Sequence, residues 1–144
     1  MSFDLKINNQ DLVIKNGQLQ QVTDSEKLIQ DILKICLTAA GSNPLHPAYG
    51  SLVSRTLIGN PLYSSVLAQI GKAQLNNCLE NLKSLQALQV KSFQRVSADE
   101  QIAAIVDISV YRSEVDLRYF NILIKAVTKG LKPITTAFRV STIW

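Results

Sequence analysis

The fold is decided by the stretch Gly41-Ser-Asn-Pro-Leu-His-Pro-Ala-Tyr-Gly-Ser51, which separates two amphipathic helical patterns. It holds two of the chain's four prolines and two of its six glycines. The prolines on either side of Leu45-His46 exclude a helix and fit poorly in a central strand. Because apolar and aromatic residues alternate here with rigid prolines, we expect an ordered loop with one shape rather than a flexible linker.

A long helix is predicted before this loop. Thr23 or Asp24 can cap it, and Gly41 is a natural stop signal. Its apolar stripe consists of Leu28, Ile32, Cys36 and Ala39, widened by Ile29, Leu33 and Leu37. The breadth of the stripe predicts burial on more than one side. The predicted solvated face consists of Lys27, Gln30, Asp31 and Lys34.

Two further helices are predicted after the loop. Residues 52–58 form a short one that Gly59 ends. Pro61 opens a second long helix, to about Leu82, at the first-turn position that proline favours. Gly71 lies within this pattern and costs up to ~1 kcal/mol relative to alanine. A close crossing with another element would explain that glycine.

Short strands are predicted over residues 3–22, with a tight hairpin turn at Asn16-Gly17, because both central positions of such a turn need positive φ. Further strands are predicted at Leu88–Val90, with a slip in parity by Phe93, and at 102–110 and 120–126. The last segment, 134–140, is predicted to be either an edge strand or an arm that reaches another subunit.

These elements together predict an α+β fold. It is an antiparallel meander of three to four strands packed against two long helices, with an N-terminal β-hairpin. The meander is expected over residues 86–127. We expect a single domain over residues 1–130, and a C-terminal strand or arm over residues 131–144.

Composition limits the class of protein. The chain has 144 residues, of which 47% are hydrophobic, enough for a core in one domain. No apolar run approaches the ~20 residues of a membrane span, and the first residues lack a signal-peptide pattern, so we expect a start in the cytoplasm and no membrane partner. Cys36 and Cys78 occupy apolar helical positions and are expected to be buried free thiols.

The net charge of +4 raises the alternative of a small basic nucleic-acid-binding domain. The basic residues are dispersed, however, and no two are adjacent. Nucleic-acid-binding proteins usually concentrate such charge on one element. The segment Arg118-Tyr119-Phe120 combines a basic residue with aromatics, but its alternation fits sheet packing better. A mildly basic solvated surface, with no nucleic-acid partner, is the favoured interpretation.

The residue inventory argues against catalysis. A nucleophilic triad needs a histidine base, and the one histidine, His46, lies between prolines. Most acidic residues fall in turns, caps or exposed helix faces rather than in pairs that face a cleft. The six glycines are isolated, so no phosphate-binding loop is present. We therefore expect no enzyme, no catalytic residues, no cofactor and no metal site.

The loop and its neighbours resemble a known family. The segment Ser42-Asn-Pro-Leu-His-Pro-Ala-Tyr-Gly-Ser51, between two helices, is similar to the baseplate wedge or sheath-initiator family of contractile phage tails, which also has a member in type VI secretion baseplates. The segments Asp11–Leu19 and Lys27–Lys34 fit the same pattern. The resemblance covers roughly residues 11 to 127. Some relatives of this family have carried a lysozyme label, which the sequence does not support.

The resemblance implies a structural protein of the virion tail baseplate, assembled in the host cytoplasm. Its implied partners are the tail sheath protein and other baseplate wedge and hub proteins. In this role the chain nucleates sheath assembly by offering a β-edge or a strand. The loop motif and the tail supply the candidate partner-binding residues, which are Pro44, His46, Pro47, Tyr49, Gly50, Ile134, Phe138, Arg139, Val140 and Trp144. The family's Glu-Pro-Arg motif before the meander is absent here, where residues 84–90 read Ser-Leu-Gln-Ala-Leu-Gln-Val.

Overall fold

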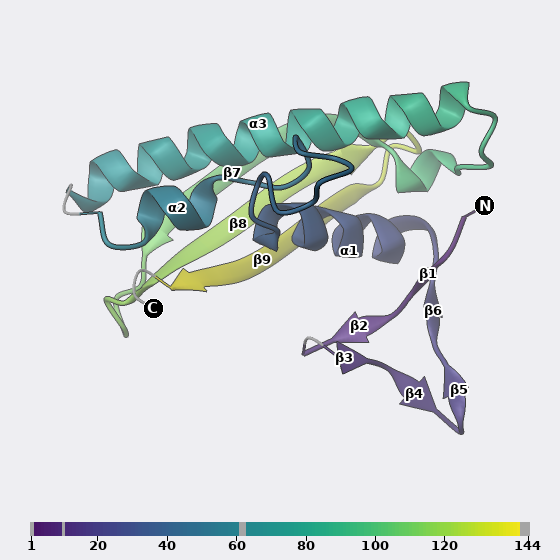
Figure 1. Cartoon of the computed structure of the whole chain (residues 1–144), viewed down its shortest axis with the longest axis horizontal. Coiled ribbons are helices and arrows are strands. Elements are labelled where there is room, and N and C mark those ends of the chain that lie inside the picture. Colours follow the sequence, from purple (N-terminus) through teal and green to yellow (C-terminus); the bar gives the residue numbers. More distant parts are fainter. Residues whose placement is uncertain (1, 10, 61–62, 142–144) are drawn as a thin grey trace.

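A computed structural model describes residues 2–9, 11–60 and 63–141. Helices pack against one face of a three-stranded antiparallel sheet, and a small module of short strands stands apart at the N-terminal end (Figure 1). The α+β fold predicted from the sequence is therefore confirmed. The helices are α1 (Asp24–Leu37), α2 (Val53–Leu57), α3 (Ser64–Lys91) and the 3-10 turn η1 (Ala98–Glu100). The sheet strands are β7 (Ile102–Arg112), β8 (Tyr119–Thr128) and β9 (Pro133–Ser141).

The N-terminal module is a ring of three antiparallel strand pairs. Its strands are β1 (Asp4–Leu5), β2 (Ile7–Asn8), β3 (Asp11–Leu12), β4 (Ile14–Lys15), β5 (Gln18–Leu19) and β6 (Gln21–Val22). Strand β1 pairs with β6, β2 with β3, and β4 with β5. The β4–β5 turn is the hairpin predicted at Asn16-Gly17, with φ of 53° and 73° at these residues. Figure 1 shows the triangular outline.

Three main-chain hydrogen bonds hold the corners of this ring together. Lys6 N donates to Gln20 O at 2.8 Å, Gln20 N to Val13 O at 2.9 Å, and Val13 N to Lys6 O at 3.0 Å. The strands themselves are mostly exposed, with Val22 as the buried apolar residue. Backbone pairing, rather than an apolar core, therefore defines the module.

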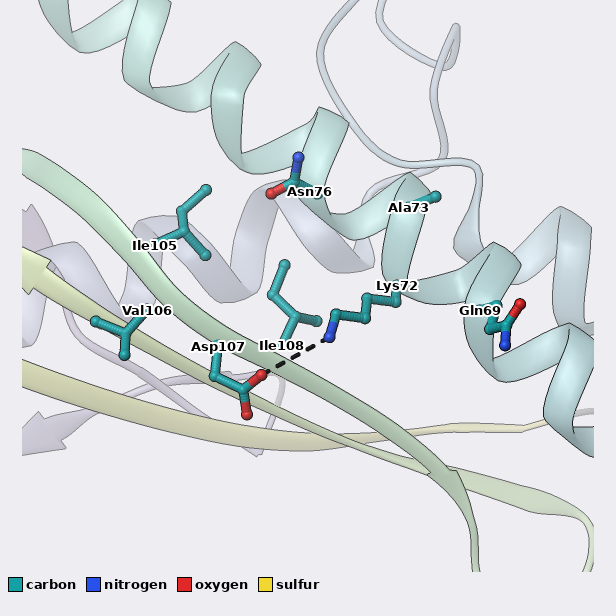
Figure 2. A pocket seen from close by; sticks show the side chains of 8 residues that line it. All are labelled: Gln69, Lys72, Ala73, Asn76, Ile105, Val106, Asp107 and Ile108. Carbon is teal, nitrogen blue, oxygen red and sulfur yellow. Dashed lines mark ion pairs between the residues drawn. The ribbon is translucent and has the colours of Figure 1, made fainter.

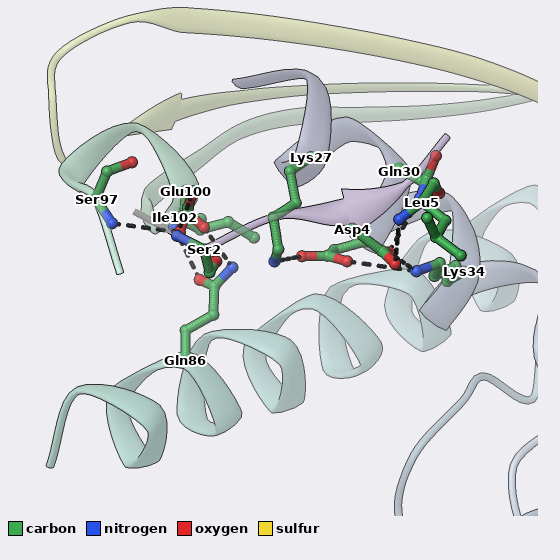
Figure 3. A network of polar contacts seen from close by, with 11 residues as sticks. Ser2, Asp4, Leu5, Lys27, Gln30, Lys34, Gln86, Ser97, Glu100 and Ile102 are labelled. Carbon is green, nitrogen blue, oxygen red and sulfur yellow. Dashed lines mark hydrogen bonds and ion pairs between the residues drawn. The ribbon is translucent and has the colours of Figure 1, made fainter. Parts of the chain in front are cut away.

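Gln30 of α1 anchors this module to the helices (Figure 3). Its side chain accepts a bond from Ile7 N at 3.0 Å and donates to Leu5 O at 2.8 Å and Asp4 Oδ2 at 3.0 Å. Lys34 also pairs with Asp4. The prediction that Gln30 lies on a solvated face is wrong, because its amide satisfies main-chain groups that the docked module would otherwise bury unpaired.

Helix α3 continues well beyond the predicted end at Leu82, through Lys91. The predicted strand at residues 88–90 is therefore wrong, and so is the meander boundary at residue 86. Leu88 and Val90 are exposed on the helix, 56% and 45% respectively. Their alternation resembled a strand, but Gln86 holds the helix in place (Figure 3), since it donates to Glu100 O and accepts from Ile102 N, both at 2.9 Å. Pro61 lies outside the described residues.

Strand β7 departs from the clean alternation predicted over residues 102–110. Its register with β8 shifts between Ile102 and Ala104, and again between Ile105 and Asp107. These bulges leave Val106 62% exposed. In contrast, the predicted inward face of β8 is confirmed by the buried residues Phe120, Ile122, Ile124 and Ala126.

The segment 133–141 is an edge strand of the same sheet. Nine consecutive residues of β9 pair antiparallel with β8, with no register shift. Ile134 is buried, and Phe138 and Val140 pack against the core formed with the helices. Of the two alternatives that the sequence left open for this segment, the structure shows the strand.

Candidate functional site

The loop at residues 41–51 is closed by its own main-chain hydrogen bonds. Gly41 N donates to Pro47 O at 3.0 Å, and Tyr49 N donates to His46 O at 3.0 Å. Asn43 Oδ1 accepts from Leu45 N at 3.0 Å, an Asx turn that fixes the first proline step. The ordered loop predicted from the sequence is confirmed.

Gly50 and Ser51 fasten this loop to the end of α1. Ser51 N donates to Thr38 O at 2.8 Å, and Ser51 Oγ donates to Cys36 O at 2.6 Å. Gly50 has φ of +116°, and a Cβ built there would lie 2.6 Å from Thr38 O. Only glycine fits this crossing without displacing backbone.

The outer side of the loop forms a pocket with α3. The pocket has a volume of about 280 Å³ and is lined by Leu45, His46, Pro47, Ala48, Tyr49, Asn81, Ser84, Leu85 and Leu88. Leu45 is 85% exposed. Pro44, His46 and Pro47 are exposed, whereas Tyr49 is half-buried against the core and Gly50 is buried. The five candidate residues of the loop thus divide into an exposed rim and a buried base.

The sheet has two outer edges, β7 and β9, that pair with no strand among the described residues. On β9, the register and the bond from Thr128 N to Lys132 O show which residues face the partner strand β8. Alternate residues of an antiparallel strand direct their main-chain groups to opposite sides. Thr135, Ala137 and Arg139 therefore direct N–H and C=O groups toward the open edge.

Polar side chains and bulges occupy the β7 edge (Figure 2). A pocket of about 410 Å³ lies there between α3 and β7, lined by Gln69, Lys72, Ala73, Asn76, Ile105, Val106, Asp107 and Ile108. Lys72 points across it toward Asp107, with their charged atoms 3.8 Å apart. Bulges and charged side chains are the features that protect edge strands from pairing with other chains.

The β9 edge carries an apolar groove instead. A pocket of about 340 Å³ runs between β9, α1 and the N-terminal module, lined by Ile7, Asn8, Asn9, Gln30, Leu33, Lys34, Leu37, Ala137 and Phe138. Leu37 is 59% exposed although it belongs to the apolar stripe of α1. Sequence reasoning missed this groove. The signal was the breadth of the α1 stripe, which exceeds what the sheet covers.

The structure places the other candidate residues on different sides of β9. Ile134, Phe138 and Val140 face the helices, and their main-chain groups face β8. Arg139 is exposed on the opposite face of the sheet. Trp144 lies outside the described residues. The loop at 41–51 and the β9 edge are two separate candidate surfaces, and the partner-binding roles of their residues remain predictions.

The carboxylates do not gather in the pockets. Each of five pockets along the described residues has at most one carboxylate in its lining, whereas glycoside hydrolysis needs two that face each other. Within the described ranges, no group of three or more His, Cys, Asp or Glu side chains could hold a metal ion. Buried Glu100 accepts bonds from Ser2 and Ser97, so it is structural.

Cys36 and Cys78 are buried free thiols, as predicted. The hydrogen bond with Cys78 and burial in the core raise the pKa of Cys36. A protonated, buried thiol is a poor nucleophile. These residues therefore act as core side chains.

The basic and aromatic residues near the β7–β8 turn are engaged within the protein. Phe120 is fully buried, with the Arg112 guanidinium 5.6 Å from its ring centroid. The Arg118 side chain bonds to both carboxylate oxygens of Asp116 and lowers the pKa of Asp116 to about 2. A buried ring offers no face on which a nucleic-acid base could stack.

No protein-family model and no curated protein sequence matches this chain. Among solved structures, the fold is similar to a crystal structure of a Geobacter sulfurreducens protein provisionally described as a tail lysozyme. The two have a TM-score of 0.61 and 11% sequence identity, over 91% of this chain and 96% of that chain. At this identity the likeness shows a common fold. None of the helices in the described ranges has the length and apolar character to span a bilayer.

Proposed function

We propose that this chain is a structural component of a contractile phage tail baseplate, and that it seeds the tail sheath by strand addition. The observation that carries the proposal is the open edge of β9. Thr135, Ala137 and Arg139 present main-chain donors and acceptors there that no other strand of the described residues occupies. An unpaired edge is a hazard in a free monomer, but it suits a protein that another chain completes.

Two further observations support this proposal. The loop at residues 41–51 resembles that of baseplate wedge proteins and is held in one conformation here. The fold is also shared with a protein whose description refers to a tail. The pocket between the loop and α3 is the proposed contact for neighbouring wedge or hub proteins, since it lies on a different surface from the β9 edge.

The test is nucleation of sheath polymerisation. The chain is mixed with the tail sheath protein from the same genome, and electron microscopy counts sheath polymers over time. We expect polymers to form sooner and at lower sheath concentration than without the chain. Equal rates with and without the chain would refute the proposed role.

A lysozyme activity is tested separately by the clearing of a peptidoglycan suspension. We expect no clearing by the wild-type chain, because no pocket described above pairs two carboxylates. Clearing that is lost on substitution of a single acid, such as Asp107→Asn, would identify an enzyme instead.

A further inference from the structure

We infer that the groove beside β9 is the binding site for the added strand, and that this strand carries apolar side chains on the face that points toward α1. The inference rests on the proposed function and specifies its site and the chemistry of its partner. The β7 edge is excluded as the alternative.

The first argument is the difference between the two edges. Strand β9 pairs with β8 over nine residues without a register shift, so its outer edge is regular. Strand β7 has two register shifts, and the Lys72–Asp107 pair lies in the pocket along it (Figure 2). A regular row of alternating N–H and C=O dipoles is complementary to another extended backbone, whereas a bulged row is not.

The second argument is the cover that a fourth strand would need. The core side of a sheet must be packed against apolar surface. Next to β9, this surface already exists beyond the present sheet, since Leu33 and Leu37 of α1 line the groove together with Ile7. Leu37 remains 59% exposed in the isolated chain. Next to β7, the corresponding helix positions are Gln69, Lys72 and Asn76, which are polar.

The third argument is that the edge amides are unsatisfied. No hydrogen bond within the described residues involves the N–H groups of Thr135, Ala137 or Arg139. The preceding edge position is Pro133, which has no N–H to donate. A bound strand would thus gain its main-chain bonds over residues 135–139, directly beside Ala137 and Phe138 in the groove.

The test measures amide hydrogen exchange of the full-length chain by NMR with two probes. One probe is a capped eight-residue peptide that alternates valine and threonine, and the other is the sheath protein from the same genome. We expect both to slow exchange at Thr135, Ala137 and Arg139. Exchange at Ile108 and Val110, whose main-chain groups face the β7 edge, should not change.

Two variants sharpen this test. Leu37→Asp places a charge in the groove and should weaken peptide binding by about tenfold or more. Ala137→Pro removes an outward N–H without touching the β8 ladder and should weaken it by about tenfold. The matched control is Val106→Asp at the exposed β7 edge, which should change affinity by less than about twofold. Circular dichroism checks that each variant is folded.

The outcomes separate the inference from the proposed function. Sheath binding that protects the β7 edge, or neither edge, overturns the inference and leaves the function standing. Protection of the β9 edge by the peptide, without any sheath binding, supports the inference and refutes the function. Equal peptide affinity of Leu37→Asp and Val106→Asp also overturns the inference.

Discussion

Gly50 is the residue whose backbone geometry most constrains the loop. Its φ of +116° and the nearby Thr38 O leave no space for a side chain. The sequence predicted an ordered loop from its prolines, since proline restricts the chain locally. It could not predict that Gly50 crosses the end of α1, because this contact depends on how two separate segments pack.

Two glycines should respond to alanine in opposite directions. Gly50→Ala should lower the free energy of unfolding by about 3 kcal/mol, because a Cβ there meets backbone at positive φ. Gly71→Ala should raise it by about 0.5–1 kcal/mol, because its Cβ would lie 3.5 Å from Val110 Cγ1, an ordinary contact within a helix. Urea unfolding measures both. A neutral Gly50→Ala would show that the crossing is not rigid.

Asp4 should make docking of the N-terminal module dependent on pH. Partial burial opposes its ionisation, but the bonds from Lys34 and Leu5 N outweigh this and lower the pKa of Asp4 below its ordinary value of 3.8. A lowered folded-state pKa contributes stability above about pH 3.8, and this contribution is lost as the pH falls through the folded-state value.

Asp4→Asn should therefore be less stable than wild type at neutral pH, with a difference that closes below about pH 3.8. Urea midpoints measured across the acid range test this. The control is Asp11→Asn, an exposed acid in the same module. Only the difference between proteins is informative, because Asp116 also titrates at about 2. A gap of constant size down to pH 2 would contradict the assignment.

At the scale of elements, local signals located most of the structure. The hairpin at Asn16-Gly17, helix α1 and the inward face of β8 follow from turn chemistry and periodicity. The strand expected at 88–90 fails for a tertiary reason. Leu88 and Val90 alternate, but Gln86 bonds to the turn before β7 and keeps the segment helical. A buried glutamine carries no periodic signal that would reveal this.

Gln86→Ala should therefore destabilise the junction between α3 and β7. It leaves Glu100 O and Ile102 N buried without partners, which costs about 3 kcal/mol. The matched control is Gln89→Ala on the exposed side of α3, expected to change stability by less than about 0.5 kcal/mol. Thermal and urea unfolding measure both variants. Equal stability of the two variants would show that Gln86 does not hold the junction.

At the scale of the whole molecule, β9 belongs to the core as well as to the open edge. The sequence analysis implied that removing residues 131–144 leaves a folded protein. The structure predicts the opposite, because Ile134 is 6% exposed and Phe138 packs against the same core. Deletion would expose that core along the whole of β8.

The truncated chain lacking residues 131–144 should accordingly lose cooperative thermal unfolding and bind a hydrophobic dye. Circular dichroism and dye fluorescence measure this. A cooperative transition close to that of the full chain would show that β9 is dispensable for folding. Tests of partner binding should therefore use point variants in β9, whose outward main-chain groups can be blocked while the inward face stays intact.

The central claim is that another chain completes the sheet at β9. Cryo-electron microscopy of this chain bound to the first sheath ring tests it most directly. The account predicts a sheath strand beside β9, with main-chain atoms about 2.9 Å from those of Ala137, and an apolar sheath side chain over Leu37. A sheath ring that contacts the chain elsewhere and leaves the β9 edge in solvent would contradict it.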